Sequence, residues 1–111
     1  VVGIDSDRVA ISTARNNSSA NKLPGVQLLF GDAHFWKPPG PIDILIANLF
    51  SELLIELLPK FKYAKWLILS GILRAQEQQI VRALQQHRID IVKIRRRGKW
   101  IAILARKAEA F

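Results

Sequence analysis

Polar side chains that could do chemistry follow three apolar runs of this sequence. Asp5 comes directly after VVGI, Asp32 comes after VQLLFG, and Asn48 follows IDILIA. A carboxylate placed just past a buried strand can accept two hydrogen bonds from a ribose diol, as in nucleotide-binding α/β proteins. Asp32 could accept from the exocyclic amine of adenine, and the amide of Asn48 offers both an acceptor and a donor. Together, the three residues favour an adenosine-type ligand with a reacting amine near Asn48.

Each of these residues also has a purely structural interpretation. Asp5 and Asp7 could cap the helix that follows them, because short acidic side chains accept hydrogen bonds from the first free amides of a helix. Asp32 could be a solvated turn acid behind Gly31. Asn48 could cap the leucine-rich segment that begins at residue 49. The residue types alone leave these alternatives open.

The elements that must position these residues alternate along the chain. Strands are predicted over 1–4, 26–30, 42–47, 66–70, 89–94 and 100–104. Helices are predicted from the N-cap Asp7 to the polar run NNSSAN, over the leucine-rich segment 49–61, which Pro59 should kink or shorten, and over 76–86.

This alternation predicts an α/β fold, a three-layer sandwich around a mostly parallel sheet with right-handed crossovers. The short link at Gly98 allows only an antiparallel hairpin at the carboxyl-terminal end. Ligands of such sheets bind outside the carboxyl ends of the strands, where Asp5, Asp32, Asn48 and the pair Ser70–Gly71 are expected.

Composition sets further bounds. The 111 residues predict a single domain, 1–111, and the absence of cysteine together with two isolated histidines predicts no metal site. No apolar run is long enough for a membrane span, so we expect no membrane partner. With no cysteine in the chain, the cytoplasm is the default compartment. The net charge of +8 raises nucleic acid as a partner, but the basic run from Lys93 to Lys99 is more typical of a protected edge strand.

Three motifs in one order give a more specific indication. With DILIANLFSELLIELLP, LILSGIL and RRRGKWIAILARK, nearly the whole chain resembles the carboxyl-terminal two-thirds of a class I S-adenosylmethionine-dependent methyltransferase domain of the PrmA type. This resemblance implies S-adenosylmethionine as cofactor, and lysine or N-terminal amines of the large-subunit ribosomal protein L11 as substrate. Carried onto matching positions, it implies Asp5 as the ribose ligand, Asp32 and Ala33 as adenine contacts, and Asn48 as the catalytic residue that touches the cofactor beside its transferable methyl group.

Two departures from the family pattern matter. The LxPGG turn before the strand at 66 is replaced by FKYAK, and the first strand and glycine-rich loop that precede GID in the family are absent. The resemblance implies the strand order 3-2-1-4-5-7-6, so the absent strand 1 would lie in the middle of the sheet. We therefore expect a fragment of a Rossmann-like methyltransferase domain that is inactive alone and prone to self-association.

Two other functions remain as alternatives. A nucleobase methyltransferase would use a related Asn motif, but here Asn48 is followed by Leu49 and Phe50 rather than by proline. A non-catalytic module could bind RNA through its basic run and Trp100. That module would explain the charge but not the acids at the strand ends.

Overall fold

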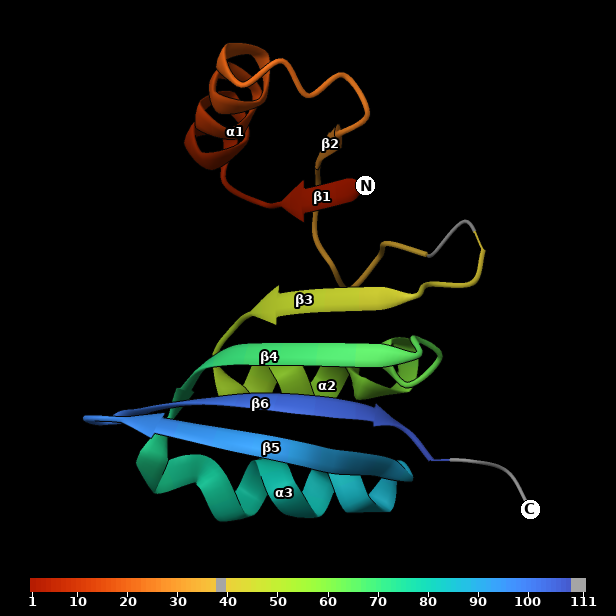
Figure 1. Cartoon of the computed structure of the whole chain (residues 1–111), viewed down its shortest axis with the longest axis vertical. Helices are drawn as coiled ribbons and strands as arrows, with labels where there is room; N and C mark the ends of the chain where they lie inside the picture. Colours follow the sequence, from red (N-terminus) through yellow and green to blue (C-terminus); the bar gives the residue numbers. More distant parts are fainter. Residues whose placement is uncertain (38–39, 109–111) are drawn as a thin grey trace. The chain divides into compact units, whose positions relative to one another are not determined.

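The computed structural model describes residues 1–37 and 40–108 (Figure 1). Contacts within the chain divide it into two compact units, one formed by residues 1–37 and one by the remainder. That all 111 residues belong to one catalytic domain stays a prediction.

The first unit is a β-α-β element. Strand β1 (Val2–Asp5) pairs in parallel with β2 (Gln27–Phe30), and helix α1 (Arg8–Ala20) packs against both strands and buries Ile11. The side chain of Asp7 accepts a hydrogen bond from the Val9 amide at 2.9 Å, which confirms the predicted N-cap. A parallel pair joined by a helix places the carboxyl ends of both strands at one edge.

Helix α1 does not end where its sequence becomes polar. It continues through NNSSA to Ala20 and has Asn21 as its C-cap, so the helix ends within the predicted run NNSSAN, at the far end of that run. Asn21 stabilises the last turn, because its backbone N–H and side-chain amide both donate to the Asn17 carbonyl, at 3.0 and 2.7 Å. Lys22 then adopts a left-handed conformation with φ of 54°, which turns the chain away from the helix axis.

The second unit contains a mixed sheet with strand order β3-β4-β6-β5. Its elements are β3 (Ile44–Asn48), α2 (Ser51–Phe61), β4 (Trp66–Leu73), the short 3₁₀ turn η1 (Arg74–Gln76), α3 (Glu77–Gln86), β5 (Ile89–Arg97) and β6 (Trp100–Lys107). Strands β3 and β4 are parallel, whereas β6 runs antiparallel to both β4 and β5. The antiparallel terminal hairpin is thus confirmed, and β5, which carries most of the basic run, is an edge strand as expected.

Helices α2 and α3 contact each other and cover one face of this sheet (Figure 1). Alternate residues of β4 and β6, such as Leu67 and Ile103, point to that face and are fully buried. Helix α2 continues through Pro59 and ends two residues later, with Leu54, Leu57 and Leu58 buried. The core of the second unit therefore lies between its sheet and one layer of helices.

The opposite face of the sheet is rich in exposed apolar side chains. Ile44 and Ile46 of β3 are 58% and 72% exposed, and their register partners Trp66 and Ile68 of β4 are 37% and 38% exposed. The side chains of Ile44, Ile46, Trp66 and Ile68 thus form an apolar surface on the sheet, which we call the open face.

No helix in the described residues is long and apolar enough to cross a membrane.

Candidate functional site

The first unit brings Asp5 and Asp32 to the same edge of a sheet. Asp5 is the last residue of β1 and is the register partner of Phe30, the last residue of β2. The Gly31 amide donates to the Asp5 carbonyl at 2.9 Å, so the chain passes from β2 into the turn that carries Asp32 right beside the end of β1. The prediction that these two acids follow neighbouring strand ends is confirmed.

Asp5 does not cap the helix. That task falls to Asp7, while one carboxylate oxygen of Asp5 accepts the Asp7 backbone N–H at 2.9 Å. This bond fixes the direction of the Asp5 side chain, which is otherwise exposed. A carboxylate has about four acceptor positions, so it can still accept hydrogen bonds from two hydroxyls of a ligand.

Asp32 organises the turn that follows β2. Its Oδ1 accepts the backbone N–H of His34 at 2.9 Å and lies 2.8 Å from the Nδ1 atom of the same histidine. The two side chains are 51% and 43% exposed, and Ala33 lies between them in the turn. Asp32 therefore serves its own turn, as the structural interpretation proposed, and is also accessible from solvent. His34 is therefore not isolated, and the D-x-H spacing that joins it to Asp32 is typical of an Asx turn.

The second unit places Asn48 at the carboxyl end of β3. Asn48 is the register partner of Ser70 on β4, and the Leu49 amide donates to the Ser70 carbonyl at 3.2 Å. Helix α2 begins at Ser51 with Phe50 as its N-cap and has no side-chain cap hydrogen bond. The capping interpretation of Asn48 was therefore wrong, and its exposed amide is not used to start the helix.

Strand β4 approaches Asn48 very closely just after Ser70. The pairing of β4 with β6 shifts register between Leu69 and Ile72, and Gly71 within this irregularity has a φ of +79°. A Cβ atom on Gly71 would overlap Oδ1 of Asn48. The structure thus brings together Asn48, Ser70 and Gly71. That this group and the two acids of the first unit line one site stays a prediction.

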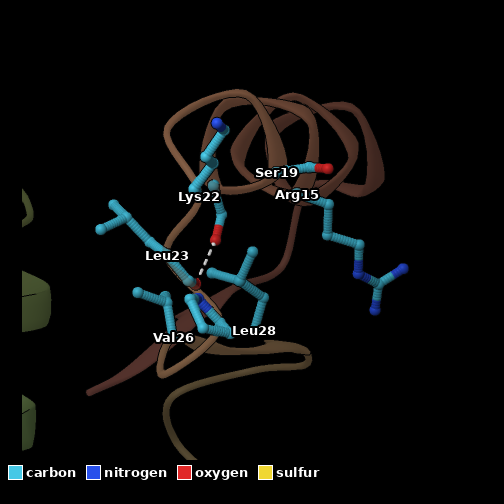
Figure 2. Close-up of a pocket in the computed structure, with 8 residues that line it drawn as sticks. Arg15, Ser19, Lys22, Leu23, Val26 and Leu28 are labelled. Atoms are coloured by element: carbon cyan, nitrogen blue, oxygen red, sulfur yellow. Dashed lines mark hydrogen bonds between the residues drawn. The ribbon is translucent and has the colours of Figure 1, made fainter.

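A pocket of about 580 Å³ in the first unit lies away from these strand ends. Figure 2 shows its lining, which comes from the end of α1, the following turn and the start of β2: Arg15, Ser18, Ser19, Lys22, Leu23, Pro24, Val26 and Leu28. The Ser18 hydroxyl is already engaged, because it donates to the Leu23 carbonyl at 2.9 Å. This is the amino-terminal edge of β2, opposite the edge that carries Asp32, so the pocket is not the predicted ligand site.

The basic run on β5 is partly neutralised within the protein. Arg96 donates from Nε and from a terminal nitrogen to the two carboxylate oxygens of Glu77, at 2.6 and 2.7 Å. The hydrogen bond from Arg96 holds the pKa of Glu77 below its usual value of 4.5, and the same bond raises the pKa of Arg96. Lys99 lies 5.4 Å from the ring centre of Trp100. These contacts give part of the run a structural role, which weakens the RNA-binding alternative.

Comparison with known proteins identifies the relatives of this chain. A profile of the family "Ribosomal protein L11 methyltransferase (PrmA)" matches residues 1–108. Relatives include the ribosomal protein L11 methyltransferases of Clostridium perfringens, 30% identical over 110 residues, and Thermoanaerobacter pseudethanolicus, 31% identical over 111 residues. Each match covers 96% of this chain and 35% of the relative, so the chain spans about a third of the length of these curated relatives.

Solved structures agree with this result. The crystal structure of a ribosomal protein L11 methylase from Lactobacillus delbrueckii subsp. bulgaricus matches 98% of this chain and 58% of that one, with a TM-score of 0.89 and 24% identity. A SAM-dependent methyltransferase from Aquifex aeolicus matches 95% of this chain and 67% of that one, with a TM-score of 0.71 and 20% identity. The chain therefore has the α/β Rossmann-like fold of these methyltransferases, with a mixed sheet and carboxyl-terminal antiparallel strands. Within that class, it belongs to the ribosomal protein L11 methyltransferase (PrmA) family.

Proposed function

We propose that the full-length protein carrying this chain is an S-adenosylmethionine-dependent methyltransferase that modifies lysine and N-terminal amines of ribosomal protein L11 in the cytoplasm. Family membership over residues 1–108 supports the class of reaction. The role assigned to Asn48 rests on one observation: its exposed amide lies at the carboxyl end of β3 and does not cap helix α2.

The two units belong, in this proposal, to one catalytic domain. The sheet orders β2-β1 and β3-β4-β6-β5 become the family order if one further strand lies between β1 and β3. That strand would belong to a part of the protein outside this chain, together with the glycine-rich loop. Helices from the same part would cover the open face and complete a three-layer sandwich. Asp5, Asp32 and Asn48 would then lie along one edge of a continuous sheet.

The residues of the first unit suit the adenosine half of S-adenosylmethionine. The Asp5 carboxylate, already oriented by the Asp7 amide, can accept hydrogen bonds from both ribose hydroxyls. Asp32 can accept from the adenine amine, and Ala33 beside it would pack against the base. The bound cofactor supplies an electrophilic methyl group on a sulfonium sulfur.

Asn48 would act on the acceptor amine. An amine attacks only as the neutral base, and its reference pKa is about 10.4 for lysine, so the site must favour loss of a proton. Exclusion of water does so, because it disfavours the charged form. The Asn48 carbonyl oxygen can accept a hydrogen bond from the neutral amine and direct its lone pair toward the methyl carbon. Holding this geometry is the main contribution of the side chain.

A methylation assay of the full-length protein tests this function. With S-adenosylmethionine and purified ribosomal protein L11, mass spectrometry should find methyl groups on lysine side chains and the N-terminal amine of L11. Asn48→Ala should lower kcat about 100-fold, because orientation of the amine is lost, and should change the Kd of S-adenosylmethionine by less than about threefold.

Ribosomal RNA without L11 serves as the control acceptor. Methylation of the RNA and not of L11 would support the nucleic-acid alternative. Equal kcat for the wild type and Asn48→Ala would remove Asn48 from the reaction while leaving the enzyme class intact.

A further inference from the structure

Gly71 occupies an unusual position in β4. The strand pairs regularly with β3 up to Ser70. Its pairing with β6 runs from Trp66 to Leu69 and resumes at Ile72 in a shifted register. Gly71 lies at this irregularity with a φ of +79°, a left-handed conformation that side chains disfavour. Such bulges bend a strand and redirect the side chains near them.

The space beside Gly71 is filled by the segment that carries Asn48. A Cβ atom at position 71 would overlap Asn48 Oδ1 and would lie 3.1 Å from the Leu49 carbonyl oxygen and 3.2 Å from the Leu49 nitrogen. Leu49 is itself held, because its N–H donates to the Ser70 carbonyl at 3.2 Å. Any side chain at position 71 must therefore displace the Asn48 amide or the backbone that supports it.

We propose that Gly71 is a positioning residue for Asn48. Because Gly71 has no side chain, the Asn48 amide can occupy the space beside β4 and keep the direction that it has in the structure. This inference rests on the proposed role of Asn48 in methyl transfer. Gly71 itself touches neither the amine nor the cofactor in this scheme. It sets where the amide oxygen can stand, and therefore where the amine is held.

The chain offers a matched control for backbone strain. Gly98, in the turn between β5 and β6, also has a positive φ, of +59°, but a Cβ atom there would meet nothing within 4 Å. Gly71→Ala and Gly98→Ala both place an alanine in a left-handed conformation. Only Gly71→Ala also introduces a steric conflict with Asn48 and the Leu49 backbone, so the difference between the two variants reports that conflict.

The first measurement is steady-state kinetics of the full-length protein with S-adenosylmethionine and L11. Gly71→Ala should lower kcat about 10- to 100-fold, since a displacement of about 1 Å is enough for such a loss, and should leave the Kd of S-adenosylmethionine within about threefold. Gly98→Ala should keep kcat within about twofold of the wild type. Equal losses in the two alanine variants would overturn the inference.

A double-mutant cycle then tests whether Gly71 acts through Asn48. In the Asn48→Ala background, Gly71→Ala should lower kcat by less than about twofold further, because no amide remains to be misplaced. The melting temperatures of the same four proteins are also measured, because Gly71→Ala could lower activity by destabilising the fold. Loss of the Asn48 side chain removes the overlap with Oδ1 and leaves only the tight contacts with the Leu49 backbone. Gly71→Ala should therefore lower Tm less in the Asn48→Ala background than in the wild type.

These measurements separate the inference from the proposed function. Equal Tm losses from Gly71→Ala in the two backgrounds, or an undiminished kcat loss in Asn48→Ala, would overturn the positioning role while Asn48 keeps its own. An unchanged kcat in Asn48→Ala alone would overturn the proposed role of Asn48, and the catalytic purpose of Gly71 with it, even if the Tm values showed coupling.

Discussion

Two aspartates only two positions apart have different tasks. Asp7 is held by α1, because its side chain accepts the Val9 amide. Asp5 is held by the Asp7 amide and contributes nothing to the helix. The sequence D-S-D allows either acid to be the cap, and only the backbone geometry at the end of β1 decides between them. The role of Asp5 as the ribose ligand is therefore tested by comparing the effects of substitutions at Asp5 and at Asp7 on cofactor binding.

We expect Asp5→Ala in the full-length protein to weaken binding of S-adenosylmethionine more than about tenfold. A carboxylate that accepts two hydroxyl hydrogen bonds contributes about 1.5–3 kcal/mol per charged hydrogen bond. Isothermal titration calorimetry measures this directly. The control is Asp7→Ala, which should lose about 1 kcal/mol of stability through the missing N-cap and keep its affinity. Similar affinities for Asp5→Ala and the wild type would exclude Asp5 as the ribose ligand.

At the scale of elements, apolar periodicity predicted the order of strands and helices, and errors occurred where local hydrogen bonds decide. The polar run NNSSAN lacks an apolar face, yet α1 extends through its first five residues and ends only where Asn21 caps the last turn. Strand β4 was predicted to stop at Ser70, yet it continues to Leu73 because Gly71 allows the bulge. The end of β3 was placed one residue before Asn48, although Asn48 is its last member.

Side-chain contacts between different elements could not be predicted from the sequence. Arg96 and Glu77 lie 19 positions apart and meet because α3 packs against β5. The close approach of Gly71 to Asn48 likewise depends on the register of two strands. The acids at the strand ends could be predicted because each apolar run in the sequence stops where its strand ends. The pairing of side chains across elements could not, because no periodicity encodes it.

The ion pair between α3 and β5 should make stability depend on acid pH. Glu77 has a lowered pKa in the folded protein, chiefly through its hydrogen bond to Arg96, so the folded state binds its proton less tightly than the unfolded state. The stabilisation is therefore present above the usual pKa of 4.5 and is lost as pH falls through the lower folded value. Glu77→Gln should be less stable than the wild type near pH 7, and the difference should shrink below pH 4.5.

Urea denaturation of the full-length protein at a series of pH values provides this measurement. Glu52→Gln is the control, because Glu52 accepts from the neutral Gln76 amide at 3.3 Å rather than from a guanidinium. A difference between the wild type and Glu77→Gln that stays constant from pH 7 to pH 3 would show that the pair does not act through protonation of Glu77.

At the scale of the whole molecule, each of the two units has a sheet whose strand edge is unpaired among the described residues. In the part of the chain that the structure describes, β1 pairs only with β2, and β3 pairs only with β4. The strand β3 also presents Ile44 and Ile46 on the open face. An unpaired strand edge beside exposed apolar side chains is a template for another strand. In the full-length protein we propose that the missing central strand fills this place. For the 111-residue chain alone, another copy is the available partner.

The 111-residue chain by itself should therefore self-associate and should not methylate L11. It retains Asp5, Asp32 and Asn48, but in the proposed arrangement the glycine-rich loop for the methionine half of the cofactor belongs to a part of the protein outside it. The methyl group would then not be held within the few tenths of an ångström that transfer requires. Light scattering should report a mass above the 12.6 kDa monomer, and a methylation assay on the same sample should show no turnover beside the full-length protein. Ile46→Lys should reduce association by placing a charge on the open face beside the edge of β3, whereas Val9→Lys, at an equally exposed position on α1, should not. A monomeric chain with the turnover of the full-length protein would contradict both expectations, and equal association of the two lysine variants would place the contact elsewhere than on β3.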